Sequence, residues 1–449
     1  MNDTIAAIST ALGVGAISII RVSGNDAINI VNKIYKGKDL NKVPSHTINY
    51  GHIIDMNNIV DEVLVSVFKA PKTFTCEDIV EINSHGGIAT TNKILELLLT
   101  NGCRLAEPGE FTKRAYLNGR IDLIEAEGIM DLINAKTEKA RSLAMNQLNG
   151  SVSNIIKKFR DDILDILANI EVNIDYPEYE DIKEYTVSDL KEKINYIENK
   201  ALEILKKSEN GKIIKEGINV AILGRPNVGK SSLLNTLLEE DKAIVTDIEG
   251  TTRDFVEGTY NLDGIVLNFI DTAGIRDTND IVEKIGVSKS LSLLDKSDLI
   301  LYILNNNEQI TEYDINLLEK IKNKKHICIV NKCDLDNKLD LSKLSNYIKI
   351  STKNKEGIDL LLKKIKELFN LELLEKDDLT YLSNARCISI LKEIITVIDS
   401  IKNGININMP IDIIEIDIKK VWELLGSIIG ESYEDELINK LFSQFCLGK

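Results

Sequence analysis

Residues 224–231 read GRPNVGKS, and this stretch decides the fold of the region around it. It fits G-x-x-x-x-G-K-[ST], a glycine-rich loop whose backbone N–H groups surround the phosphates of a nucleotide. The apolar run 218–223 before it predicts a buried strand, and residues 231–238 after it predict a helix. A strand, a loop and a helix N-terminus in this order favour a phosphate-binding loop in an α/β domain over a chance match.

The loop supplies the first predicted nucleotide contacts. Lys230 is expected to pair with the β- and γ-phosphates, and the hydroxyl of Ser231 is expected to bind Mg²⁺. The residues of the loop predicted to bind the nucleotide are Asn227, Val228, Gly229, Lys230, Ser231 and Ser232.

Two further segments are typical of the γ-phosphate and Mg²⁺ region. Asp271, Thr272, Ala273 and Gly274 follow a strand-like run at 265–270, so a carboxylate can hold Mg²⁺ through water while the Gly274 N–H meets the γ-phosphate. The polar loop 250–254 reads GTTRD and suits a switch. In that loop Thr252 is the predicted Mg²⁺ ligand, while Arg253 is equally well read as a solvated charge or as a catalytic group.

The base is predicted from N-K-x-D. Asn331, Lys332 and Asp334 follow the apolar run 327–330. A carboxylate at Asp334 can accept two N–H donors from the edge of guanine, which adenine lacks, so the motif indicates GTP. Asn331 is expected to bridge toward the phosphate loop, and the stem of Lys332 to lie over the base. Ser351, Thr352 and Lys353 follow another strand-like run and form a predicted backbone contact to the base.

The group that helps hydrolysis is not evident from the phosphate motifs. Small signalling GTPases place a water-positioning Gln after the glycine of D-x-x-G, and this chain has Ile275 there. Glu283 lies in the same region and could act through a bridging water. From spacing alone, an ordinary surface carboxylate at a helix start is the favoured reading of Glu283.

Composition limits the remaining classes. The chain has 449 residues, enough for about three domains, and no run of eighteen apolar residues that would predict a membrane span. Six scattered cysteines without a C-x-x-C pair and no secretory signal indicate a reducing, cytoplasmic location. The net charge of −15 argues against a broad nucleic-acid footprint. A local basic stretch is best explained as solvated helix faces; it comprises Lys136, Lys139, Arg141, Lys157, Lys158 and Arg160.

Periodicity divides the chain into α+β and α/β domains with helical segments. Residues 1–118 alternate strand-like and helical runs, 119–212 are helical, 217–370 carry the nucleotide motifs, and 371–449 are helical again. The two amphipathic helical segments need a partner, so we expect one discontinuous helical domain into which a Ras-like P-loop G domain is inserted.

With these pieces placed, the chain resembles the MnmE/TrmE family of tRNA-modification GTPases over its full length. The matching stretches are GRPNVGKSSLLN at 224–235, IVTDIEGTTRD at 244–254, DTAGIR at 271–276, IRVSG at 20–24, GEFTKRA at 109–115 and the terminal CLGK at 446–449. A C-x-G-K ending is a signature of this family.

The resemblance implies an N-terminal folate-binding domain that forms a homodimer, a helical domain and an inserted G domain that dimerises transiently. It implies that, with an FAD-dependent flavoprotein partner (MnmG/GidA), the protein adds an aminomethyl or carboxymethylaminomethyl group at C5 of wobble uridine 34 in certain tRNAs. A 5-formyl- or methylene-tetrahydrofolate derivative would supply the one-carbon unit. Hydrolysis of GTP would depend on Mg²⁺ and K⁺.

The resemblance also assigns residues. Asn227, Thr246, Thr251 and the Ile248 carbonyl match the family's K⁺ ligands, and Thr246 and Thr251 join the GTP contacts. Glu283 matches its water-orienting carboxylate, which replaces the surface reading. Arg21, Glu81, Arg120 and Lys449 match its folate contacts, and Cys446 is a catalytic candidate near the one-carbon unit. Two positions depart from the family: Arg120 stands where Lys is expected, and 351–353 reads S-T-K where S-A-x is usual.

Two alternatives to this enzyme remain to be separated. A ribosome-assembly GTPase without modification chemistry shares the nucleotide motifs but not the N-terminal domain or the C-x-G-K tail. A scaffold with a dead nucleotide site is disfavoured because Lys230, Ser231, Thr252, Asp271 and Asp334 are all present. The sequence leaves open the tRNAs, the nitrogen donor, the folate oxidation state and whether Cys446 is a nucleophile.

Overall fold

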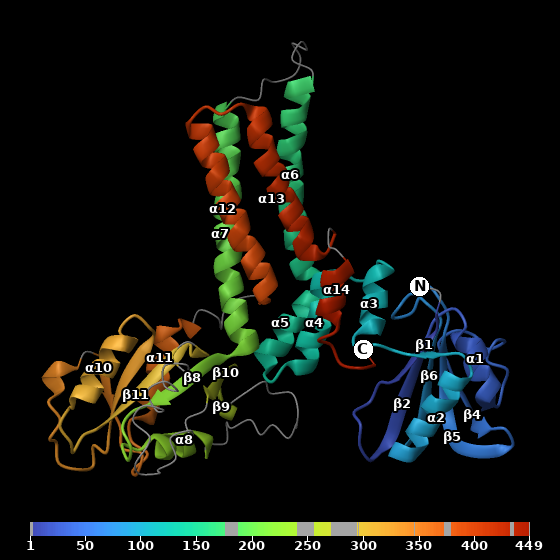
Figure 1. Ribbon diagram of the computed structural model, residues 1–449, viewed down its shortest axis with the longest axis horizontal. Coiled ribbons are helices and arrows are strands. Elements are labelled where there is room, and N and C mark those ends of the chain that lie inside the picture. Colours follow the sequence, from blue (N-terminus) through green and yellow to red (C-terminus); the bar gives the residue numbers. More distant parts are fainter. Residues whose placement is uncertain are drawn as a thin grey trace. The chain divides into compact units, whose positions relative to one another are not determined.

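The computed structural model describes residues 3–175, 187–239, 256–270, 294, 296–344, 346–371, 379–431 and 435–448. The chain divides into two compact units (Figure 1). The N-terminal unit comprises residues 1–130, 153–186 and 403–449, and the nucleotide unit comprises residues 131–152 and 187–402.

A seven-stranded sheet in the order β3-β4-β5-β6-β2-β1-β7 forms the base of the N-terminal unit. Its strands are β1 (Ile5–Ile8), β2 (Gly15–Ser23), β3 (Tyr35–Lys36), β4 (Thr47–Asp55), β5 (Asn58–Phe68), β6 (Ile79–Gly86) and β7 (Arg104–Leu105). Neighbouring strands run antiparallel, except that β1 and β7 are parallel. Strands β2 and β6 lie side by side, and they carry the functional residues described below.

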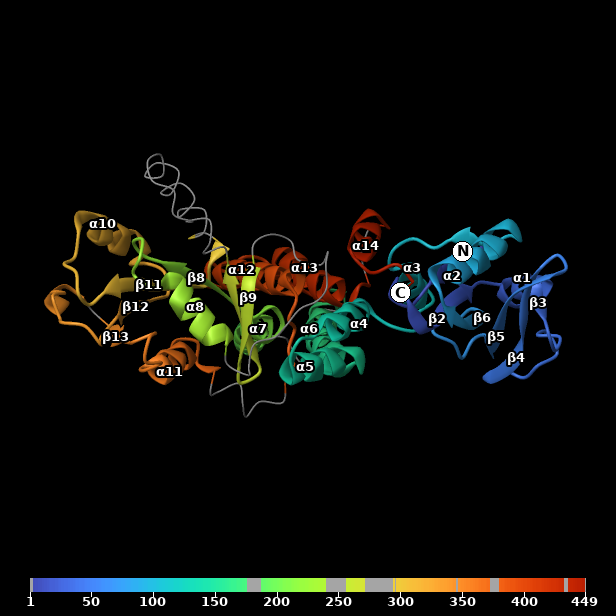
Figure 2. The ribbon, with the colours of Figure 1, turned by 90° about the horizontal axis from the view of Figure 1, so that it is seen from below.

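Two helices cover one face of this sheet, α1 (Ala27–Ile34) and α2 (Ile88–Thr100) (Figures 1 and 2). Val31 and Leu98 of these helices are fully buried against Val22 and Ile82 of the strands. Alternate residues of each strand therefore enter this core, and the intervening residues face the other side of the sheet.

The strand-like runs at 15–22, 63–68 and 79–83 predict β2, β5 and β6 of this sheet. The structure extends β5 back to Asn58 and adds β1, β4 and the two short strands. Strand β4 reads TINYGHIID, in which Asn and Gly interrupt the apolar alternation. Pairing with β5 stabilises it, and that pairing is a tertiary contact that local propensity does not report.

Short helices follow the sheet in the same unit: α3 (Glu110–Leu117), α4 (Leu123–Asn134) and the C-terminal α14 (Asp435–Phe442). Phe442 and Phe445 are buried with Leu123 of α4 in a separate apolar cluster. The sequence predicted that the last helix runs to Phe445, which is wrong: α14 ends at Phe442. The N–H of Phe445 bonds to the Phe442 carbonyl in a turn, which lets both rings pack together.

The long helices α6 (Ser151–Asp175) and α13 (Ile411–Ile429) also meet in this unit. The guanidinium carbon of Arg160 lies 3.8 Å from the ring centroid of Trp422, and Arg160 forms an ion pair with Glu431. A side chain at Gly426 would meet this guanidinium, since a Cβ there would lie 3.2 Å from it.

The nucleotide unit holds a six-stranded sheet in the order β13-β12-β11-β8-β10-β9. Its strands are β8 (Ile218–Leu223), β9 (Val256–Leu262), β10 (Ile265–Ile270), β11 (Leu299–Asn305), β12 (His326–Asn331) and β13 (Tyr347–Lys349). Only β9 runs antiparallel to its neighbour. In a parallel sheet the carboxyl ends of the strands share one edge, where ligands bind.

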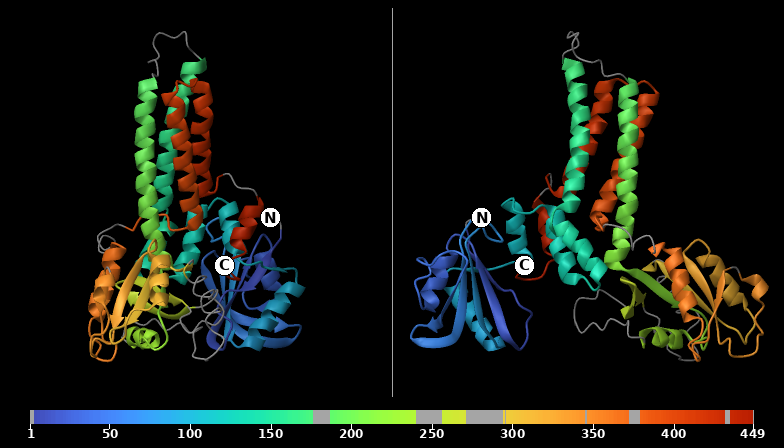
Figure 3. Two further views of the ribbon diagram at one scale, coloured as in Figure 1. Left: turned by 60° about the vertical axis from the view of Figure 1, so that its left-hand side comes forward. Right: turned by 180° about the vertical axis from the view of Figure 1, so that it is seen from behind.

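Helices cover both faces of this sheet (Figure 3). The two on one face are α8 (Lys230–Leu238) and α11 (Ile358–Leu368), whose Leu233 and Leu361 are buried against Val220. On the other face α10 (Glu312–Ile321) buries Ile321 against Ala221. A one-turn 3₁₀ helix, Leu341–Lys343, precedes β13. The predicted mixed α/β fold with a P-loop domain is confirmed in these coarse terms.

The remaining helices of the nucleotide unit are α5 (Glu138–Leu148), α7 (Val187–Glu216) and most of α12 (Ala385–Asn406). Ion pairs join α7 to α12, one of them between Lys402 and Glu198 at 2.8 Å. Helix α7 continues through Gly211. A Cβ at Gly211 would lie 2.9 Å from the Leu382 carbonyl, so close packing explains this glycine. Gly217, with φ of 81°, ends the helix.

Three of the six basic residues at 136–160 form ion pairs: Arg141 with Glu138, Lys157 with Asp122, and Arg160 with Glu431. These pairs agree with the reading of this stretch as helix faces. Across the described helices, no segment is both long and apolar enough to cross a lipid bilayer.

Candidate functional site

The phosphate loop lies between β8 and α8, and its glycines are sterically required. Gly229 has φ of 105° and stands immediately before the first turn of α8. A Cβ at Gly229 would lie 2.2 Å from the side-chain nitrogen of Asn331, and one at Gly224 would lie 2.4 Å from the Ile303 carbonyl. No larger residue fits at either position without displacing the loop. Helix α8 begins directly after Gly229, so its N-terminus adjoins the phosphate loop.

Lys230 reaches back across this loop. Its Nζ donates to the carbonyls of Gly224 at 3.0 Å and Arg225 at 2.8 Å. The ammonium group is thus held within the curve of the loop, where its charge can meet phosphate oxygens.

Asn331 joins the phosphate loop to the base-contacting segment. It is fully buried at the end of β12; its Nδ2 donates to the Val228 carbonyl at 2.9 Å, and its Oδ1 accepts from the Thr352 N–H at 3.2 Å. Lys332 makes a parallel link, since its Nζ donates to the Asn227 carbonyl at 2.7 Å. Five predicted contact residues, from three separate stretches of chain, are therefore brought to one edge of the sheet.

The Asp334 side chain is exposed, and a hydrogen bond fixes its orientation. Its Oδ1 accepts from the Ser351 hydroxyl at 2.7 Å. That hydrogen bond, together with a backbone N–H and the charges of Lys353 and Lys332, holds the pKa of the Asp334 carboxyl below its ordinary value. A carboxylate that stays ionised at neutral pH is an acceptor for two N–H donors of a purine edge.

Part of the predicted site lies outside the described residues. This applies to Thr246, Ile248, Thr251, Thr252, Asp271, Thr272, Ala273, Gly274, Glu283 and Lys449. Their roles toward Mg²⁺, K⁺, water and folate therefore stay predictions.

Sequence reasoning missed an ion-pair network behind the phosphate loop. Arg225, the second loop residue, pairs with Asp314 at 3.1 Å and Glu308 at 3.1 Å. Asp314 is fully buried, accepts from the Tyr302 hydroxyl at 2.6 Å, and forms a capping box with Thr311 at the start of α10. Burial and this hydrogen bond raise the pKa of Tyr302. The T-x-x-D pattern at 311–314 was the available signal for the cap, but nothing local pointed to Arg225.

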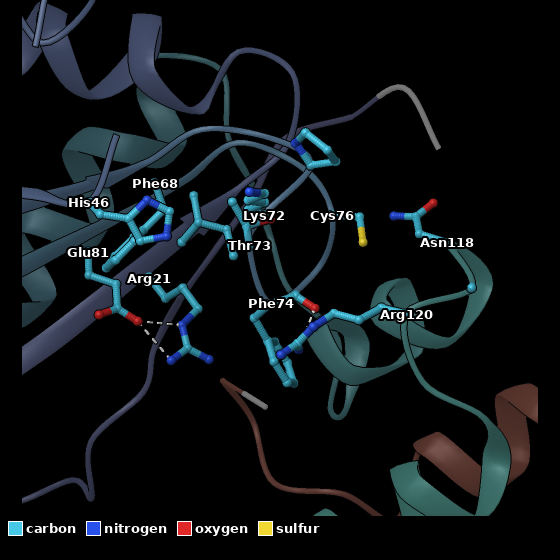
Figure 4. A pocket seen from close by; sticks show the side chains of 13 residues that line it. Arg21, His46, Phe68, Lys72, Thr73, Phe74, Cys76, Glu81, Asn118 and Arg120 are labelled. Carbon is cyan, nitrogen blue, oxygen red and sulfur yellow. Dashed lines mark hydrogen bonds and ion pairs between the residues drawn. The ribbon is translucent and has the colours of Figure 1, made fainter. Parts of the chain in front are cut away.

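A second candidate site is a cavity of about 550 Å³ in the N-terminal unit (Figure 4). Arg21 on β2 and Glu81 on β6 are cross-strand partners, and they form an ion pair with 2.8 Å between Nη2 and Oε1. Arg120, which follows α3, donates from Nη1 to the Phe74 carbonyl at 2.9 Å, with its guanidinium carbon 5.0 Å from the Phe74 ring centroid. The three predicted folate residues that the structure describes therefore line one cavity.

Sequence reasoning missed the other lining residues, most of which come from loops, while Phe68 ends β5. They include His46, Phe68, Lys72, Phe74, Cys76 and Asn118. The wall at 74–77 is tied down by Arg114 of the GEFTKRA stretch, whose side chain is 1% exposed and pairs with Glu77 at 3.1 Å. Arg114 also pairs with Asp3 and Glu110. Two residues of the GEFTKRA stretch, Glu110 and Arg114, therefore have a structural role in this ion-pair network.

The C-terminal tail is bound to the same unit. The Ser9 hydroxyl donates to the Gly448 carbonyl at 3.2 Å, and the Gly109 N–H donates to the Cys446 carbonyl at 3.2 Å. Gly448 has φ of 86°, and a Cβ there would lie 2.5 Å from the Ile8 carbonyl. Cys446 is exposed and is not a lining residue of the cavity. The tail therefore docks beside β1, the neighbour of the strand that carries Arg21.

Known families match almost the whole chain. Residues 123–446 match the MnmE helical domain, and residues 4–120 match the N-terminus of the GTP-binding protein TrmE. The chain is 53% identical to the tRNA modification GTPase MnmE of Streptococcus mutans over 450 residues, covering 100% of this chain and 99% of that protein. It is 54% identical to MnmE of Lactococcus lactis subsp. cremoris over 448 residues, covering 100% and 98%.

The matches extend over both units, and the phosphate loop, the N-K-x-D motif and the N-terminal cavity all lie inside them. On this evidence the chain belongs to the MnmE family of tRNA modification GTPases.

Proposed function

We propose that this protein hydrolyses GTP and uses hydrolysis to modify C5 of the wobble uridine, position 34, in certain tRNAs. The observation that carries the proposal is the buried Asn331, which joins the phosphate loop to the guanine-reading segment in a chain of this family. The named relatives are tRNA modification GTPases, and the proposal extends that activity to this chain.

The nucleotide roles follow from the chemistry of each group. Lys230 binds the β- and γ-phosphates, Ser231 and Thr252 hold Mg²⁺, and Asp334 accepts from guanine. Mg²⁺ supplies positive charge against the phosphate oxygens when bound. The hydroxyl oxygens of Ser231 and Thr252 suit that hard cation.

A monovalent cation is part of the proposal. Asn227, Thr246, Thr251 and the Ile248 carbonyl are all oxygen donors, which is the donor type that K⁺ accepts. Glu283 orients the attacking water, since Ile275 has no polar group for that task. Positive charge near the β- and γ-phosphates stabilises the charge that builds up in phosphoryl transfer.

The N-terminal cavity is proposed to bind a tetrahydrofolate derivative, which supplies the one-carbon unit when bound. Its residues fit a flat, polar, anionic molecule. Glu81 and Arg21 offer an acceptor and donors at the floor, Phe68 and Phe74 offer apolar faces, and Arg120 offers a cation. Lys449 completes the folate contacts, and Cys446 serves the chemical step beside them.

The partners complete the proposal. An FAD-dependent MnmG/GidA protein acts with this one on tRNA in the cytoplasm. The protein forms a homodimer through its N-terminal domain, and its G domains dimerise transiently during hydrolysis.

Nucleoside mass spectrometry of tRNA from cells lacking this protein tests the proposal. We expect the C5-modified uridines of position 34 to disappear and to return with the wild-type gene but not with a Lys230→Ala variant. Unchanged tRNA nucleosides, together with a ribosome-assembly defect and no binding of 5-formyltetrahydrofolate to the full-length protein, would favour the regulatory GTPase instead.

A further inference from the structure

The N-terminal cavity carries more positive charge than its one carboxylate balances. Its lining contains Arg21, Lys72 and Arg120 against Glu81 alone. Arg21 is neutralised by Glu81, with two hydrogen-bond-length contacts at 2.8 and 2.9 Å. The charges of Lys72 and Arg120 are therefore left for something else in the cavity.

Neither of these cations has an ion-pair partner among the described residues. Lys72 is exposed, and within the described part of the chain it has no hydrogen-bond or ion-pair partner. Arg120 donates one hydrogen bond, to the Phe74 carbonyl, and stacks on the Phe74 ring; its other N–H groups have no acceptor among the described residues. Stacking fixes the plane of this guanidinium while leaving its remaining donors available, which suits a carboxylate.

The backbone that carries Lys72 is held in place. The Thr73 N–H donates to the Pro71 carbonyl at 2.9 Å, and the Thr73 hydroxyl donates to the Glu77 carbonyl at 2.6 Å. These bonds order the loop next to Lys72, and Figure 4 draws the Lys72 side chain among those that line the cavity. Because the neighbouring backbone is already ordered, binding an anion costs the rotamer freedom of the Lys72 side chain but little backbone freedom.

An adjacent cavity of about 460 Å³ has the opposite character. It shares Cys76 and Asn118 with the first but is lined by Glu77 and Asp78 and by no basic residue. An anionic group is therefore directed toward Lys72 and Arg120 and away from this side.

We propose that Lys72 and Arg120 bind the carboxylates of the folate's glutamate tail, so that affinity rises as γ-linked glutamates are added. This inference rests on the proposed folate site. A small anion with an aromatic part fits this cavity better than tRNA phosphates, because Phe68 and Phe74 place aromatic surface beside the cations.

Equilibrium binding by the full-length protein tests this with three ligands: tail-less 5-formyltetrahydropteroate, the monoglutamate 5-formyltetrahydrofolate and its triglutamate. We expect affinity to increase in that order, by about five- to tenfold from the monoglutamate to the triglutamate at low salt, and this gain to shrink as salt rises. Lys72→Ala should lose most of the gain, and Lys72→Arg should keep it. Lys42→Ala is the matched control, because Lys42 is exposed, pairs with Asp39 and does not line the cavity.

The outcomes are distinguishable. Equal affinities for monoglutamate and triglutamate overturn the tail inference and leave the folate site standing. Binding of none of the three ligands overturns the folate site and the inference with it. If Lys72→Ala keeps the gain with tail length but weakens tRNA binding, the cations serve the RNA and the inference is wrong. Melting temperatures of the variants equal to the wild-type value exclude misfolding as the cause of a loss.

Discussion

The Ser9 hydroxyl donates a hydrogen bond to the carbonyl of Gly448, 3.2 Å away and 439 positions later in the chain. Ser9 in turn donates its N–H to the Ile19 carbonyl on β2 at 2.8 Å, two residues before Arg21. Through these two bonds the last residues of the protein are tied to the strand that lines the N-terminal cavity.

Because the tail docks within the N-terminal unit, changing the tail tests tRNA modification separately from GTP hydrolysis. Deleting residues 446–449, or making Cys446→Ser, should lower tRNA modification. GTP turnover should stay near the wild-type rate, because none of these residues is a predicted GTP contact. Steady-state GTPase assays and tRNA nucleoside analysis of the same preparations measure both. Wild-type modification by both variants would leave the tail without a chemical role.

Asp334→Asn should change the base that is bound. The amide replaces a two-acceptor carboxylate by one acceptor and one donor, which suits the 2-oxo edge of xanthine and not the amino edge of guanine. We expect GTP affinity to fall by about a hundredfold and affinity for xanthosine triphosphate to rise. Competition binding of the two nucleotides measures the switch, and undiminished GTP affinity would show that the base site is misassigned.

Hydrolysis should depend on the monovalent cation. Replacing K⁺ by Na⁺ should lower the catalytic rate with little effect on GTP affinity, because the cation acts on charge that forms in the transition state. Glu283→Ala should likewise lower the rate and preserve binding. Rates measured at several protein concentrations should rise more than linearly if G domains pair. Identical rates in the two salts contradict this prediction.

Asp314→Ala should destabilise the nucleotide unit. The change leaves Arg225 and the Tyr302 hydroxyl without their buried acceptor and removes the capping box of α10. Breaking a buried ion pair costs about 3–5 kcal/mol of unfolding free energy. Urea denaturation measures the loss. Glu312→Ala, an exposed acid in the same helical turn, is the control and should stay within about 0.5 kcal/mol of wild type.

Stability should fall in acid through Glu110. Burial alone raises the pKa of this carboxyl, but hydrogen bonds from Arg104, the Glu107 N–H and Arg114 outweigh burial and place the pKa below its ordinary value. A depressed pKa in the folded state adds stability above the unfolded value, about 4.3, and that stability is lost as pH falls through the folded value. Glu110→Gln should therefore have a lower free energy of unfolding than wild type at pH 7. Between about pH 5 and pH 3, its free energy of unfolding should change less with pH than that of wild type. Parallel stability curves for the two proteins would contradict this assignment.

The nucleotide site shows what the sequence by itself determined. The loop at 224–231 and the N-K-x-D at 331–334 are short stretches in which each residue type meets a fixed part of GTP, so identity and spacing within one segment specify the chemistry. The strands before them are continuous apolar runs, which a sheet covered on both faces requires. The glycine before the helix is the residue type that adopts the positive φ found at Gly229 without strain.

Only the tertiary structure decided which distant residues meet. Lys72 and Phe74 lie in the loop between β5 and β6, and Arg120 lies between α3 and α4, so no periodicity relates them to Arg21. The same holds for Arg225 with Asp314 and for Ser9 with Gly448. Such contacts depend on strand pairing and packing across the whole unit, because a side chain's partners in space are set by the sum of many long-range contacts and not by its neighbours in sequence.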